Sequence, residues 1–164
     1  MSLLLDVCQW LNDLPASQAL AESEWAFPSI ESVHVLSLAL MAGTLALVDL
    51  RVLGLALPGL QVSVVTRRLL PLTWTGFALM LASGAVLFAS EAARLYGSSA
   101  FRAKMLLMLL AGVNAAVFHA TVFARVGDWE NAAIAPARAR FAAATSLLLW
   151  AGIIVCGRFI AYFH

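Results

Sequence analysis

Three histidines, His34, His119 and His164, are the residues of this sequence whose side chains are best suited to chemistry, and Glu31 lies close to the first of them. Glu31 and His34 form an E-x-x-H pair, and their spacing of three places both side chains on one face of a helix. In di-iron bundles this motif must occur twice, with two further Glu residues. A di-iron site is therefore not expected here. Glu31 is expected to accept a hydrogen bond from His34 and fix its tautomer.

His119 is expected deep in an apolar segment, where an imidazole is either a bundle histidine with a hydrogen-bond partner or a ligand of haem or copper. At 1.5 Å per residue, His34 would lie about 8 Å and His119 about 24 Å below the outer membrane surface. Because each axial ligand lies only about 2 Å from an iron, one haem shared by both histidines is disfavoured.

Two arrangements remain open: separate outer and inner sites, or no cofactor. For an outer haem b site on His34, the candidate second ligands at similar depth are Met108 and His164, since His/Met ligation occurs in cytochromes. For an inner site His119 has no evident second ligand. The candidate metal ligands are His34, His119 and Glu31.

Three other polar residues are expected to be structural. Asp49 and Arg51 close the first apolar segment, and their spacing of two does not favour a pair on one helix, so each is expected to bind a neighbouring element. Asn114 lies five residues before His119. Arg102 and Lys104 are expected to extend toward lipid headgroups.

The composition shows which kind of element must position these residues. Of 164 residues, 63% are hydrophobic and 12% are charged, whereas soluble domains are near half apolar and a quarter charged. The mean hydropathy is +0.92. The lipid bilayer is therefore the expected environment. A net charge of +1 gives no concentrated basic face and excludes nucleic acid as a partner.

Charged residues divide the chain into apolar segments long enough to cross about 30 Å of hydrocarbon. Four transmembrane helices are predicted, at about 29–50, 70–91, 103–125 and 139–162. The fold class is thus an all-α, integral membrane four-helix bundle over 29–164. Residues 1–28 are expected to form an N-terminal interfacial amphipathic helix with a turn at Pro15, followed by a helix capped by Ser17. Gly43, Gly76, Gly84 and Gly112 are expected at close helix contacts.

The distribution of basic residues sets the expected orientation. Six lie on one side of the predicted spans and four on the other; the six are Arg51, Arg67, Arg68, Arg125, Arg138 and Arg140. This bias, with an N-terminal segment that has acids and no bases, places both termini outside. A bacterial inner membrane with periplasmic termini is expected, and a cleaved signal peptide is not.

Three strings carry a resemblance to a known family. They are Trp25–Leu36, with the motif FPxxExxH; Val48–Gly54, with DLRxLG; and Phe101–Met105, followed by Asn114 and Phe118–His119. The chain resembles a family of small bacterial four-span membrane proteins of unknown function. It is more loosely similar to four-helix membrane cytochrome b and copper-resistance membrane proteins, in size and in having membrane histidines. Three histidines are one fewer than two bis-histidine haems need.

The leading hypothesis for function is haem b binding and electron transfer, with quinone or a periplasmic redox partner. The alternative is a cofactor-free partner or scaffold subunit, and copper or other metal transport is a third reading. A homo-oligomer is compatible with all three. The sequence contains no GxSxG, HExxH, GxGxxG or phosphate-loop motif, which disfavours hydrolytic and nucleotide chemistry.

Overall fold

The computed structural model describes residues 3–132 and 134–160, and its described elements are all helical, which confirms the all-α class. His164 lies outside the described residues. The elements are α1 (Leu3–Asn12), α2 (Pro15–Ala21), α3 (Ala26–Val52), α4 (Val62–Ser90), α5 (Ala92–Gly97), α6 (Ser99–Val117), the π-helix η1 (Phe118–Val122), the 3₁₀-helix η2 (Phe123–Asp128) and α7 (Ala137–Ile160).

Four helices within the described residues are long and apolar enough to cross a membrane: α3, α4, α6 continued by η1 and η2, and α7. Their lengths are 27, 29, 30 and 24 residues. Many of their large apolar side chains point outward, as Leu109 and Leu148 do with 64% and 74% of their surface exposed. Exposed apolar surface on this scale is suited to lipid rather than water. The protein is thus a multi-pass membrane protein with four candidate spans.

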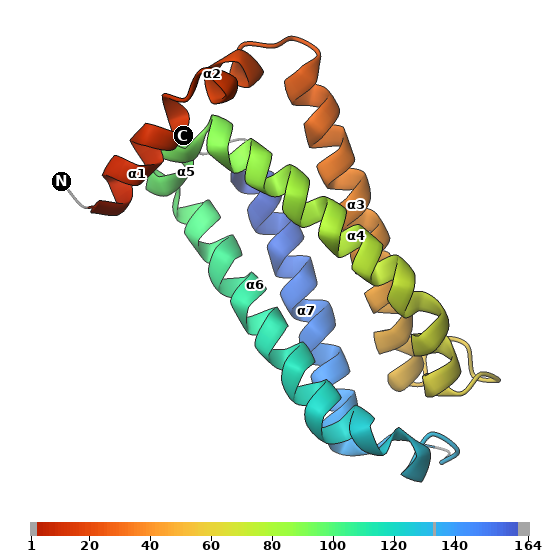
Figure 1. Ribbon diagram of the computed structural model, residues 1–164. Coiled ribbons are helices and arrows are strands. Elements are labelled where there is room, and N and C mark those ends of the chain that lie inside the picture. The colour runs from red at the N-terminus through yellow and green to blue at the C-terminus, as the bar shows by residue number, and fades with distance from the viewer. Residues whose placement is uncertain (1–2, 133, 161–164) are drawn as a thin grey trace.

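The spans form two hairpins, α3 with α4 and α6 with α7, joined through contacts between α3 and α7 (Figure 1). By contrast, α4 and α6 make few contacts. We call one end of the bundle the His34 end; it holds the N-termini of α3 and α6 and the C-termini of α4 and α7. The opposite end, with the loop 53–61, η1 and η2, is the His119 end. Helices α1, α2 and α5 lie at the His34 end.

The α3–α4 hairpin is closely packed along its middle. A Cβ on Gly76 of α4 would lie 2.9 Å from the backbone nitrogen of Met41 and 3.0 Å from the carbonyl oxygen of Ser37, both in α3. Nearer the His119 end, the hydroxyls of Thr44 and Thr73 lie 2.8 Å apart. Gly76, which has no side chain, therefore allows the backbones of α3 and α4 to approach closely, as expected for small residues between membrane helices.

The DLRxLG string contains the stop signal of α3. Gly54 has a φ of +78°, which glycine adopts without steric cost. The N–H of Leu55 donates to the carbonyl of Leu50 at 2.9 Å, and the N–H of Gly54 donates to that of Arg51 at 3.1 Å. These two bonds form a Schellman motif, which satisfies carbonyls left open at a helix end. Arg51 Nε also donates to the carbonyl of Leu60 in the following loop.

Two helix starts differ from the expected ones. Helix α4 begins at Val62 rather than near 70, because Arg67 and Arg68 lie exposed on its surface within the helix instead of marking its boundary. In the N-terminal segment, Ser17 lies buried inside α2 and is not its N-cap. Pro15 occupies the first turn of that helix, where its missing N–H leaves no hydrogen bond unmade.

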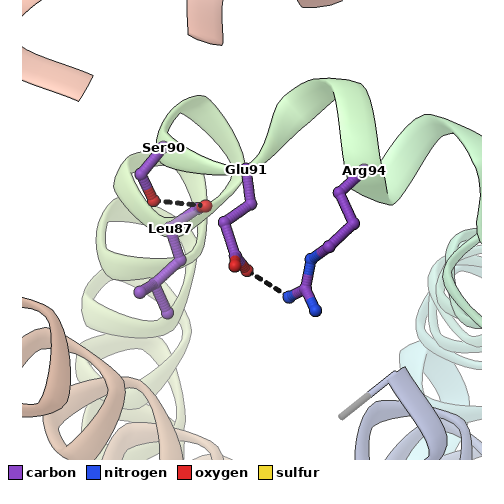
Figure 2. Close-up of polar contacts among 4 residues, drawn as sticks. All are labelled: Leu87, Ser90, Glu91 and Arg94. Atoms are coloured by element: carbon purple, nitrogen blue, oxygen red, sulfur yellow. Dashed lines mark hydrogen bonds and ion pairs between the residues drawn. The ribbon is translucent and has the colours of Figure 1, made fainter. Parts of the chain in front are cut away.

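The chain bends between α4 and α5, a short helix that the sequence did not predict. Ser90 Oγ donates to the carbonyl of Leu87 at 2.9 Å in the last turn of α4. Figure 2 shows the next residue, Glu91, pointing toward Arg94 of α5, with which it forms an ion pair. The bend turns α5 across the His34 end, where it packs against α1.

The third span changes its helical form before it ends. After Val117 the α-helix passes into η1 and then η2, with non-helical dihedrals at Arg125. Trp129 Nε1 donates to the carbonyl of Val122 at 3.2 Å. Phe118 and Trp129 pack against a small core at the His119 end, made of Val52, Val62, Ala139 and Ala143.

Candidate functional site

His34 is half-buried in α3 and its imidazole is held by α4. Its Nδ1 lies 3.0 Å from the carbonyl oxygen of Met80 and 3.1 Å from Ser83 Oγ. A carbonyl oxygen can only accept, so Nδ1 carries the proton. Ser83 Oγ itself donates to the carbonyl of Leu79 at 2.6 Å and so also accepts from His34. In the neutral ring, Nε2 therefore keeps its lone pair.

Gly84 makes room for this imidazole. A Cβ at that position would lie 2.9 Å from His34 Cε1 and 3.3 Å from Nδ1, but 4.0 Å from Nε2. The Nδ1–Cε1 edge of the ring therefore faces α4. The close contact at Gly84 agrees with the one expected from the sequence, and its partner is the side chain of His34.

A cavity of about 330 Å³ adjoins His34 at this end of the bundle. Its wall is almost entirely apolar, and His34 and Lys104 are the two titratable side chains of its described lining. The lining comes from all four spans: His34, Leu38, Met80, Leu81, Gly84, Ala85, Phe88, Phe101, Lys104, Met105, Met108 and Ile153. This volume lies at the lower end of the range of small-molecule sites, which are commonly apolar with a few polar groups.

The cavity is partly open to the bundle surface, and α4 and α6, which both line it, make few contacts with each other. Leu81 of α4 and Met105 of α6 line it, yet are 55% and 48% exposed. Phe88 and Phe101 bridge the two helices with their rings stacked at 5.5 Å. Parts of the cavity lining from α4 and α6 are thus also exposed at the surface of the bundle.

Glu31 takes no part in holding His34. Its side chain is exposed, and the hydrogen bonds of the imidazole run to α4 instead. The expected Glu31–His34 hydrogen bond is therefore not formed. Although a spacing of three places the two residues on neighbouring positions of α3, packing against Gly84 turns the imidazole toward the interior.

His119 lies at the opposite end of the bundle, in η1. Its side chain is exposed and contacts two rings, Phe118 at 5.6 Å and Phe123 at 5.1 Å between centroids. His119 thus lies within the third candidate span, Ser99–Asp128, but its imidazole faces outward from the bundle. His34 and His119 are not brought together, as the difference in depth predicted.

Of the other proposed ligands, Met108 lines the cavity with His34, whereas His164 lies outside the described residues. Within residues 3–132 and 134–160, no group of three or more His, Cys, Asp or Glu side chains is placed to hold a metal ion. The candidate metal ligands His34, His119 and Glu31 therefore do not form one cluster.

Asp49, Arg51 and Asn114 each bind a different element of the chain. The Asp49 carboxyl of α3 lies near the Ser146 side chain of α7, while its Oδ2 is buried without a partner in the described part of the chain. Arg51 binds the α3–α4 loop, and Asn114 Nδ2 donates to the carbonyl of Ala142 in α7 at 3.0 Å. All three therefore connect elements, as a structural role requires.

Sequence reasoning did not assign Lys104 or the Phe88–Phe101 stack to the site. Lys104 was expected to extend toward headgroups, yet it lines the cavity, and its Nζ lies 3.7 Å from the position of a Cβ on Gly157. One signal was available: Lys104 is the sixth residue of a span, far enough inside for an ionisable group to be a candidate.

Comparisons with known proteins agree with this description of the bundle. The model of a family of unknown function, DUF6644, matches residues 26–163, from the first residue of α3 to beyond the end of α7. No curated protein and no solved structure is significantly similar to the chain. The matched residues include His34, Lys104 and the whole described lining of the cavity. The chain therefore belongs to the DUF6644 family of unknown function.

Proposed function

We propose that this membrane protein binds haem b in the cavity at the His34 end, with His34 as an axial ligand, and passes electrons within the bilayer. The observation that carries the proposal is the hydrogen bond from Nδ1 to the carbonyl of Met80. Metal-bound histidines commonly donate their second N–H to such an acceptor, which fixes the ring and leaves Nε2 for the metal.

The other residues of the site are compatible with haem. An apolar lining suits a macrocycle, and the thioether of Met108 in the same lining is the candidate second ligand. Three residues of α4, Met80, Ser83 and Gly84, contact the Nδ1–Cε1 edge of His34, so its ring is already oriented. Bound haem would supply one-electron transfer, and the protein's own residues would hold and orient it.

The proposed setting is the inner membrane of a bacterium, with both termini in the periplasm. In that orientation the His34 end lies near the periplasmic surface, where a periplasmic redox partner can approach. The exposed lining residues of α4 and α6 face the lipid, from which a quinone can approach. The proposal thus assigns the two classes of electron partner to two different sides of one cavity.

Absorption spectra of purified protein, oxidised and then reduced with dithionite, test the proposal. Wild type is expected to show a Soret band and reduced α and β bands, and His34→Ala to lose them. His119→Ala is the matched control, because His119 is an exposed imidazole at the other end. Wild type without haem bands after reconstitution with haem would overturn the proposal, as would equal losses in both variants.

Two finer variants test the geometry. Gly84→Ala retains His34 but places a methyl group against its ring, so haem affinity is expected to fall about tenfold or more while the fold persists. Met108→Leu is expected to retain haem and lose the six-coordinate spectrum. An unchanged spectrum in Met108→Leu would contradict the second ligand, and unchanged affinity in Gly84→Ala would contradict ligation by His34.

The alternative function, a cofactor-free partner or scaffold subunit, is favoured by a specific observation. The His34 imidazole already joins α3 to α4 through two hydrogen-bond contacts, as a structural histidine does in a membrane. On this reading His34→Ala lowers stability, and haem added to the pure wild-type protein gives no bound spectrum. The same reconstitution experiment therefore separates the two functions.

A further inference from the structure

Lys104 is an ammonium inside a membrane span with no anionic partner among the described residues. It is half-buried, one and a half turns from the start of α6, and forms no hydrogen bond or ion pair with a described side chain or carbonyl. Its titratable neighbours are the Cys156 thiol and the His34 imidazole, neither of which is a carboxylate.

The setting makes an unpaired ammonium costly. Ionisable groups in spans generally pair or mark a functional site, because low-dielectric surroundings penalise a lone charge. The position of Nζ near Gly157 places it beside the last turns of α7, whose negative dipole end offsets part of the charge. A full negative charge beside Lys104 would offset the rest.

The lining of the cavity beside Lys104 indicates which kind of molecule could supply this negative charge. Apart from His34 and Lys104, its lining consists of aliphatic, thioether and phenyl groups and of glycine. Leu81 of α4 and Met105 of α6 line it and are 55% and 48% exposed on the apolar outer surface of the bundle. A ligand that enters here must be soluble in lipid, and one anionic group on it would match the single ammonium.

We propose that the cavity is a binding site for lipid-soluble carboxylates, whose carboxylate pairs with Lys104 while the apolar body occupies the space between α4 and α6. Haem meets this description through its propionates, and a long-chain fatty acid meets it through its head group. The proposal depends on Lys104 and the cavity, and it does not require the iron ligation assigned above to His34.

Matched pairs of acid and ester test the pairing. Haem and haem dimethyl ester are titrated into the protein in phosphatidylcholine nanodiscs. In parallel, electron paramagnetic resonance measures the motionally restricted fraction of spin-labelled stearate and of its methyl ester. Wild type is compared with Lys104→Gln and with Arg102→Gln, which removes an exposed charge of the same helix outside the cavity lining. Lys104→Arg tests conservative rescue.

Wild type is expected to bind at least one acid about tenfold or more tightly than its ester, the usual scale of a charge-assisted hydrogen bond. Lys104→Gln should lose this preference, whereas Arg102→Gln and Lys104→Arg should keep it. Equal binding of acid and ester by wild type, binding of neither acid, or equal loss in Arg102→Gln would overturn the proposal.

The two arms also separate the sources and the two proposals. A preference for stearate over its ester, with no binding of haem or its ester, supports the carboxylate site and removes the haem function. Haem binding that needs His34 but does not distinguish acid from ester, with no preference for stearate either, supports the haem function and overturns the carboxylate site. A preference for haem over its ester, without one for stearate, identifies propionate as the group that Lys104 recognises.

Discussion

The two ends of the bundle differ in where their charged side chains lie. At the His119 end they bind the chain itself: Arg51 donates to the carbonyl of Leu60, and the Glu130 carboxylate accepts from the N–H of Ser63. At the His34 end, His34 and Lys104 line an apolar cavity, and neither Nε2 of His34 nor Nζ of Lys104 has a hydrogen-bond partner among the described residues. Charged groups at the first end therefore hold loops and helix ends together, whereas two titratable groups at the second lie beside an apolar cavity.

The cleft at the His119 end and the cavity at the His34 end also differ in the charge of their lining residues. Charged side chains line the cleft of about 250 Å³ at the His119 end, namely Arg51, Glu130 and Arg140, and it lies among loops. The cavity of about 330 Å³ at the His34 end lies between membrane helices and is almost wholly apolar. Substitutions at the His119 end should therefore change stability, whereas those at the His34 end should change ligand binding.

The largest expected effect on stability comes from the close contact between α3 and α4 at Gly76, in the middle of the bundle. Gly76→Ala would drive a methyl group into backbone atoms of Met41 and Ser37, which cannot move aside as a side chain can. The free energy of unfolding, measured in mixed detergent micelles, is expected to fall by about 2–3 kcal/mol, the upper range for overpacking. Ligand binding should fall as well, because α4 carries the partners of His34.

Gly112→Ala is the matched control for this prediction. No atom lies within 4 Å of the corresponding Cβ position in α6. Alanine is also a better helix former than glycine by about 0.5–1 kcal/mol. Its stability should equal or slightly exceed that of wild type. Equal stabilities of Gly76→Ala and Gly112→Ala would show that the α3–α4 hairpin is looser than the close backbone approach implies.

Val62→Ala tests the His119 end alone. Val62 is 2% exposed in the core with Val52, Ala139 and Ala143. Removing two buried carbons is expected to lower the free energy of unfolding by about 2 kcal/mol, from lost burial and the space left behind. Binding of haem or stearate, measured well below the unfolding temperature, should be unchanged. A parallel loss of binding would contradict the separation of the two ends.

The sequence predicted the bundle but only part of the site, for physical reasons. Apolar length between charges locates spans, because a helix must cross a fixed thickness of hydrocarbon. This criterion misplaced the start of α4, because Arg67 and Arg68 lie exposed on the surface of the helix and do not mark its boundary. The span containing His119 was predicted, but not the outward direction of its imidazole, because the side of the bundle that a residue faces depends on tertiary packing.

Recognition of the site needed contacts between distant residues. Nothing local to His34 indicates that Ser83 will accept its hydrogen bond or that Gly84 will face its ring, since both lie about fifty positions away on another helix. The local pattern suggested Glu31 instead. Lys104 was visible as a charge inside a span, but its place beside the cavity follows from how the four spans pack together.

The smallest expected effect concerns the loops that close the His119 end. Helix α4 has no side-chain cap from Gln61, and the carboxylate of Glu130 accepts from the N–H of Ser63 at 3.3 Å instead. A negative charge at a helix N-terminus stabilises it by about 0.3–1 kcal/mol at low salt. Glu130→Gln should lower the free energy of unfolding by this amount and leave ligand binding unchanged.

The dependence on salt concentration tests whether Glu130 stabilises the N-terminus of α4 through its charge. Because exposed charges are screened over about 10 Å at 0.1 M salt and about 3 Å at 1 M, the difference between wild type and Glu130→Gln should shrink as salt is raised. Gln61→Ala is the neutral control, since it removes only the hydrogen bond from Gln61 Nε2 to Asn131 Oδ1. Its effect should not depend on salt. If salt changes the stability losses of Glu130→Gln and Gln61→Ala equally, Glu130 acts through the shape of the loop rather than through its charge. Burial would then distinguish the two ends of the bundle better than charge does.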